Sequence, residues 1–168
     1  MRFVFEFYYA YNGYVPTALT TITLGNVYRL ANSAFRGMPE LTDVTVNFVD
    51  AYSSSSSYPY PYIGTYAFYE CENLETLTLN SENGLYGVGT YAFAYCSSLT
   101  EIELPIHSGF EASNSTSTSY NLPTNVFTGC TALAEVTMGA PGSIYSGSTY
   151  YMQNLLPDTV TTVNLKYY

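Results

Sequence analysis

Apolar residues recur along this chain in one short pattern, which occurs four times in full. In each copy an Ala-Phe or Val-Phe pair is followed by Cys or Met three residues after the Phe, by Leu after six, and by apolar residues after nine and eleven. The copies occupy residues 30–47, 63–80, 88–105 and 122–139. The last part of each copy alternates apolar and polar residues in a β-prone run, which predicts a half-buried strand.

Six strands are expected in all. Residues 15–24 and 156–165 carry the same ending as the four copies, without the Phe and Cys half. A single copy cannot bury its apolar residues alone, so the copies are expected to stack, with atypical units at the two ends. The inward pairs of the full copies are Val44 and Val46, Leu77 and Leu79, Ile102 and Leu104, and Val136 and Met138.

The pattern A-F-x-x-C-x-x-L-x-x-Φ-x-Φ, where Φ is apolar, resembles the BspA-like class of leucine-rich repeats, a family of cell-surface repeat proteins. Met38, in the cysteine position of the first copy, is the main departure, and it suits an apolar slot. Together, the stacking and the resemblance predict a leucine-rich-repeat solenoid: one short parallel β-sheet of about six strands, with short helical or irregular turns on the opposite side and little regular helix. The resemblance implies an extracellular binding or adhesion module and offers no catalytic residues.

The chain is predicted to be a single domain over residues 1–168, with an N-terminal strand or cap over 1–14 and coils over 15–165. Its 47% hydrophobic content is enough to bury a core without disulfides or metal. Unequal spacing of the Leu anchors marks three insertions after strands, at 48–62, 106–121 and 139–155. Insertions at equivalent places of a repeat emerge on one side, so we expect these three to cluster.

The insertions are rich in Tyr, Ser, Gly and Asn, the residues that antibody loops use. Tyr supplies a large amphipathic contact area at a small loss of rotamer entropy. The insertions are therefore candidate ligand-binding loops, and the alternative is that they are solvated connections. The candidate contact residues are Tyr52, Tyr58, Tyr60, Tyr62, Tyr120, Tyr145, Tyr150 and Tyr151.

Outward positions of the predicted strands form two rows across the sheet. The first is Thr21, Asp43, Thr76, Glu101, Glu135 and Thr162, and the second is Thr23, Thr45, Thr78, Glu103, Thr137 and Asn164. A regular Thr-x-Thr array would resemble an ice-binding surface, but the acids interrupt it, which favours β-branched residues on an exposed sheet. The candidate contact residues on this acidic, Thr-rich face are Asp43, Thr76, Thr78, Glu101, Glu103 and Glu135.

The charge balance excludes two classes of partner. Four basic residues stand against thirteen acids, for a formal net charge of −9. Such a surface repels phosphate backbones and anionic headgroups, so nucleic acid and membrane surfaces are not expected as partners. The sequence contains no run of about 18 to 20 apolar residues, so membrane insertion is not expected. The Tyr-, Ser- and Thr-rich composition favours an extracellular or cell-surface location, although the first residues do not read as a signal peptide.

No set of residues indicates an enzymatic reaction, a cofactor or a metal. The single histidine, His107, follows a strand with no nucleophile implied nearby, so a hydrolase triad is not expected. Cys71, Cys96 and Cys130 fall in an inward slot, where burial keeps a thiol protonated and inert. Free thiols are therefore expected, with a disulfide between the adjacent-coil residues Cys71 and Cys96 as the alternative.

Two functions fit the sequence. The first is an extracellular protein-interaction or adhesion module that binds a protein or glycan ligand through the Tyr/Ser-rich loops and the acidic face. The second is a structural subunit of a surface filament or viral fibre, in which copies of the chain stack end to end. The open strands at the two ends of a coil stack favour the second function, because unpaired strand edges are templates for pairing.

Overall fold

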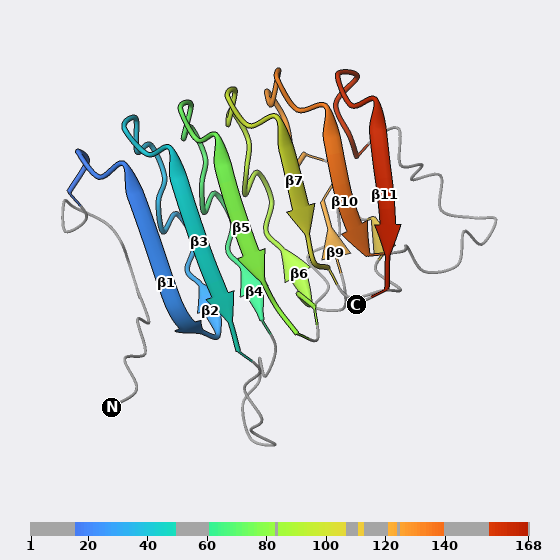
Figure 1. Ribbon diagram of the computed structural model, residues 1–168, viewed down its shortest axis with the longest axis horizontal. Helices are drawn as coiled ribbons and strands as arrows, with labels where there is room; N and C mark the ends of the chain where they lie inside the picture. Colours follow the sequence, from blue (N-terminus) through green and yellow to red (C-terminus); the bar gives the residue numbers. More distant parts are fainter. Residues whose placement is uncertain are drawn as a thin grey trace.

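A computed structural model describes residues 16–49, 61–82, 84–106, 111–112, 121–123, 125–139 and 155–167. Within these ranges the chain forms parallel strands joined by turns, without helix. Successive repeat units, called coils here, lie side by side along the long axis of the molecule (Figure 1).

Six longer strands line one side of the coil stack, at the positions that the apolar alternation predicts (Figure 1). Each pairs in register with its neighbour, so that Val44 lies beside Leu77 and Val136 beside Ile102. The inward residues of these pairs are buried. The strands are β1 (Thr21–Val27), β3 (Asp43–Phe48), β5 (Thr76–Asn80), β7 (Glu101–Leu104), β10 (Glu135–Gly139) and β11 (Thr162–Lys166).

The expectation of one continuous sheet of about six strands is wrong, because the strands divide into β1-β3-β5 and β11-β10-β7. At the other junctions one carbonyl just before the strand accepts two successive amides of the next coil, as Thr42 does from Glu75 and Thr76. No such pair forms between β5 and β7, where the Ser98 amide instead donates to the Glu72 carbonyl, 3.1 Å away. The two strands are neighbours without a hydrogen-bonded ladder, and we call this line the seam.

A third parallel sheet lies on the opposite side of the coils, where helical or irregular turns were expected. It has the strand order β2-β4-β6-β9-β8. Its strands are only two residues long because each copy offers one inward apolar residue there, such as Leu30, Ile63 or Val88. The strands are β2 (Arg29–Leu30), β4 (Tyr62–Ile63), β6 (Gly87–Val88), β8 (Glu111–Ala112) and β9 (Asn121–Leu122).

Between a short strand and the following long strand, each full copy turns around its buried phenylalanine. The rings of Phe35, Phe68, Phe93 and Phe127 stack in one column, with centroids 5.3, 5.8 and 5.8 Å apart. The backbone of each turn also bonds to the next coil: the Phe68 amide donates to the Ala92 carbonyl at 2.7 Å. The turns therefore join the coils by both apolar stacking and hydrogen bonds, and they lie between the short strand and the long strand of each copy.

This close approach requires glycine at the start of two turns. A Cβ atom on Gly64 would lie 2.5 Å from the carbonyl carbon of Ala31, and one on Gly89 would meet the backbone of Thr65. Backbone atoms cannot yield as a flexible side chain can. Gly25 in β1 is the opposite case, because a Cβ there would have no atom within 4 Å.

We predict that Gly64→Ala lowers the free energy of unfolding by about 2 kcal/mol or more, since the added methyl group forces two coils apart. Gly25→Ala is the matched control. It should leave stability unchanged or raise it by up to about 1 kcal/mol, because alanine restricts the unfolded chain. Urea denaturation followed by circular dichroism measures both, and equal midpoints for the two variants would contradict the close approach.

Candidate functional site

The outward side chains of the six long strands form a polar face, and strand register aligns them as the sequence predicts. Thr21, Asp43 and Thr76 are register partners, as are Thr23, Thr45 and Thr78. Across the seam, Glu101, Glu135 and Thr162 align, and so do Glu103, Thr137 and Asn164. Most of these residues are exposed or half-buried, but Thr137 is buried, and its hydroxyl lies 3.4 Å from the Asn164 amide nitrogen.

Negative charge gathers on the β7 and β10 part of this face. Glu101 and Glu135 are register partners, and Glu103 lies two residues after Glu101 on the same side of β7. The Lys166 ammonium lies 2.8 Å from the Glu103 carboxylate, with both side chains about half exposed. To reach it from β11 the lysine crosses β10, whose Gly139 has no side chain at the register position beside Lys166.

An asparagine pair lies at the end of β3 and β5. The Asn80 amide nitrogen donates to the Asn47 side-chain oxygen at 2.8 Å, and the Asn47 nitrogen donates to the Leu24 carbonyl at 3.1 Å. The Asn80 side-chain oxygen is thereby left at the end of this chain of hydrogen bonds. It stands next to the seam.

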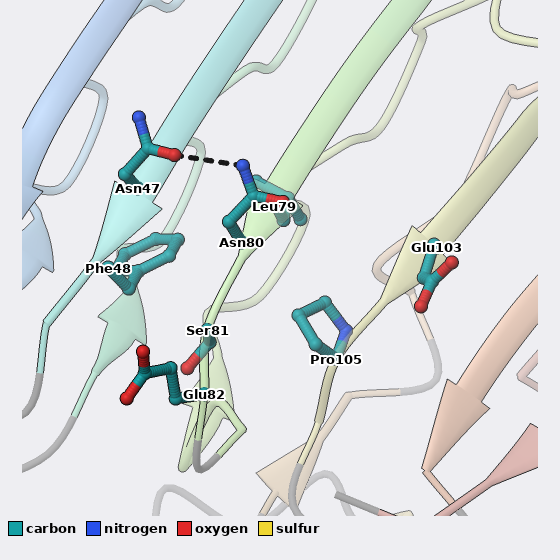
Figure 2. A pocket seen from close by; sticks show the side chains of 8 residues that line it. All are labelled: Asn47, Phe48, Leu79, Asn80, Ser81, Glu82, Glu103 and Pro105. Atoms are coloured by element: carbon teal, nitrogen blue, oxygen red, sulfur yellow. Dashed lines mark hydrogen bonds between the residues drawn. The ribbon is translucent and has the colours of Figure 1, made fainter.

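A pocket of about 390 Å³ opens where the seam ends (Figure 2). Phe48 and Leu79 are 5% exposed, and with the buried Pro105 they form its apolar wall. Amide, hydroxyl and carboxylate groups form the rest. The lining residues are Asn47, Phe48, Leu79, Asn80, Ser81, Glu82, Glu103 and Pro105.

The comparison with protein-family models decides the family. The model described as "BspA type Leucine rich repeat region" matches residues 9–164 in six copies. The chain belongs to the BspA-type leucine-rich repeat family. Membership indicates a protein-interaction module, in a family whose members are generally non-enzymatic and typically extracellular or at the cell surface.

Two solved structures of leucine-rich repeat proteins are similar to this chain. A T. pallidum leucine-rich repeat protein is 16% identical, with a TM-score of 0.46, over 86% of this chain and 69% of that one. A leucine-rich repeat protein from Bacteroides ovatus ATCC 8483 is 19% identical, with a TM-score of 0.40, over 88% of this chain and 43% of that one. No curated protein sequence matches the chain.

The cysteines of the BspA-type repeats lie in the core as free thiols, so the alternative of a disulfide between Cys71 and Cys96 does not hold. Each thiol donates to the phenylalanine carbonyl of the preceding coil, as Cys96 does to Phe68 at 3.2 Å. Burial raises the pKa of Cys71 to about 11 and that of Cys130 to about 12, and it raises the pKa of Cys96 well above the ordinary value. Their chemistry is structural, since a thiol must ionise to act as a nucleophile.

Of the tyrosines predicted to bind ligand from the insertions, Tyr62 is the one within the described residues. It lies in β4, half-buried, with the Arg29 guanidinium carbon 5.0 Å from its ring centroid. Burial raises the pKa of its phenol, against the lowering effect of Arg29. Outside the described residues lie Tyr52, Tyr58, Tyr60, Tyr120, Tyr145, Tyr150 and Tyr151, and also His107.

A group of tyrosines on the phenylalanine turns was not anticipated from the sequence. Tyr66 and Tyr91 stack in parallel with centroids 5.6 Å apart, and Tyr69 meets Tyr95 edge to face at 5.3 Å. The Arg36 guanidinium carbon lies 4.8 Å from the Tyr69 ring centroid, within cation–π range. The available signal was a tyrosine two residues before the phenylalanine in two consecutive copies.

The described residues contain no helix long and apolar enough to cross a membrane. They also contain no group of three or more His, Cys, Asp or Glu side chains placed to hold a metal ion.

Proposed function

We propose that this chain is an extracellular protein-interaction and adhesion module, and that it binds a basic protein surface on the acidic face. The contact residues are Asp43, Thr76, Thr78, Glu101, Glu103 and Glu135. The observation that carries the proposal is the alignment of Glu101, Glu103 and Glu135 on one flat side of β7 and β10. Charge complementarity of this kind steers association and selects the partner.

A protein is favoured over a glycan as the main ligand because the face is broad and flat. Six strands in two sheets present polar side chains over it, and a pocket lined by residues of β3, β5 and β7 opens at its border. The Tyr/Ser-rich insertions, with Tyr52, Tyr145 and their neighbours, are proposed to extend the contact at its border. Rigid tyrosines add contact area at small entropic cost.

The test compares three glutamate substitutions on the face with three acid substitutions on the turns. We predict that Glu101→Gln, Glu103→Gln and Glu135→Gln together raise the Kd for a basic ligand about tenfold, mainly through slower association. The control carries Glu40→Gln, Glu72→Gln and Asp158→Asn, which remove as many charges from exposed turn positions. Both are measured by surface plasmon resonance against a panel of purified extracellular matrix proteins.

Two outcomes would overturn this assignment. One is an equal effect of the two variants on the Kd, which would mean that binding depends on the net charge of the chain and not on the acidic face. The other is a wild-type affinity that does not weaken between about 50 and 300 mM salt, because exposed charge pairs are screened over this range. Replacing the insertion tyrosines with serine in a third variant measures the contribution of the loops separately.

A second function, a filament subunit that assembles by end-to-end stacking, is favoured by the two terminal strands. Val163 and Leu165 in β11 occupy inward register positions but are 40% and 53% exposed. Within the described residues β1 pairs with β3 alone and β11 with β10 alone. The sequences Thr-Ile-Thr-Leu of β1 and Thr-Val-Asn-Leu of β11 would place Ile22 beside Val163 in a parallel contact between copies.

For this second function, sedimentation velocity at increasing concentration and negative-stain imaging should show linear oligomers. We predict that Leu165→Glu abolishes them, because a charge would then be buried between two strands. Thr131→Glu, at an exposed turn position away from both terminal strands, is the control and should leave them unchanged. A monodisperse wild-type monomer at millimolar concentration would contradict end-to-end assembly.

A further inference from the structure

We propose that the pocket at the end of the seam is a socket for a single arginine side chain of the protein that binds the acidic face. The inference rests on the proposed function, to which it adds an anchor residue. It is carried by an apolar wall, a buried hydroxyl without a hydrogen-bond partner and the Glu82 carboxylate, which line one hollow (Figure 2).

The apolar wall fits the aliphatic part of such a side chain. Phe48 is the last inward residue of β3. Leu79 and Pro105 line the hollow from the ends of β5 and β7. Arginine buries its methylene stem along apolar surface while its charged end keeps polar contacts. A volume of about 390 Å³ accommodates one such side chain with accompanying water.

Three lining residues that are consecutive in the chain each offer a hydrogen-bond acceptor. The Ser81 hydroxyl oxygen is buried and has no hydrogen-bond partner in the structure. The Asn80 amide uses its nitrogen to donate to Asn47, which leaves its oxygen to accept. With the Glu82 carboxylate this makes three acceptor groups from consecutive residues at the end of β5. A buried polar atom without a partner costs free energy, so a ligand that supplies a donor gains from it.

Guanidinium matches this set better than ammonium does. It presents five N–H donors in a planar fork and keeps its charge at any physiological pH. Glu103, on the β7 side of the pocket, already pairs with Lys166 of the same chain at 2.8 Å. That carboxylate is therefore already paired within the chain, and Glu82 supplies the carboxylate that faces an incoming cation. A neutral sugar can hydrogen-bond to the Glu82 carboxylate but makes no charge pair with it.

The experiment uses Nα-acetyl-arginine methylamide as the probe and the full chain labelled with ¹⁵N. Amide spectra are recorded during titration at low salt. We predict saturable shifts centred on the side-chain amides of Asn47 and Asn80 and the backbone amides of Ser81 and Glu82. The Kd should lie in the millimolar range, as suits one anchored side chain. The citrulline derivative, which has the same shape without the charge, should bind at least about tenfold more weakly.

Two variants test the pocket residues. Ser81→Ala removes a hydroxyl that makes no hydrogen bond in the free protein, so the fold should be as stable as before while the Kd rises severalfold. Glu82→Gln should weaken arginine binding about tenfold. Glu72→Gln is the matched control, an exposed glutamate on a turn that does not line the pocket.

The inference is overturned if arginine and citrulline bind equally, if the shifts lie elsewhere, or if neither binds at 50 mM. It is also overturned if N-acetylglucosamine shifts the same amides while arginine does not. Because the probe needs no identified partner, these outcomes are independent of the matrix-protein measurements. A chain that binds a basic protein through its face but ignores the probe keeps the proposed function and loses only the socket.

Discussion

The backbone hydrogen bonds that join one coil to the next at the phenylalanine turns are the constraint on which the rest of the structure depends. They hold adjacent coils close together at the points where the chain turns. The turns themselves require positive φ at residues such as Tyr66 and Tyr91. The same closeness excludes a side chain at Gly64. Phenylalanine, cysteine and leucine then fill the space between the long and the short strands, each in contact with its copies in neighbouring coils.

Because the turns join the coils, the long strands need not all pair. Between β5 and β7 the coils remain connected at the turn, through Ser98 and Glu72, and at the far end, through a bridge between Leu85 and Ile106. Between these two links no hydrogen-bonded ladder joins β5 to β7, and the pocket opens at the end of this seam. The polar face thus consists of a Thr-rich half and an acidic half, with a hollow near their boundary.

Much of the fold was predictable from spacing alone. Inward residues such as Leu77 and Leu79, and the aligned outward rows, follow from a period of two within a repeated unit. The division of the sheet was not predictable, because the copies on either side of the seam have the same apolar spacing as the copies whose strands pair. The two-residue strands were not predictable from the sequence, because a single apolar residue, such as Ile63, shows no periodicity. The acidic rows could be read from the sequence, whereas the pocket is lined by residues far apart in the chain, such as Phe48 and Pro105.

The most direct measurement is native-state hydrogen exchange of the backbone amides in the turns. If coil-to-coil bonds at the turns hold the stack together, the amides of Phe35, Phe68 and Phe93 should exchange only through global unfolding, with the same opening free energy as the amides of β3 and β10. The Arg36 amide, which bonds within its own turn to Ser33, should open at lower free energy. Exchange of the three phenylalanine amides as fast as that of Arg36 would contradict the account.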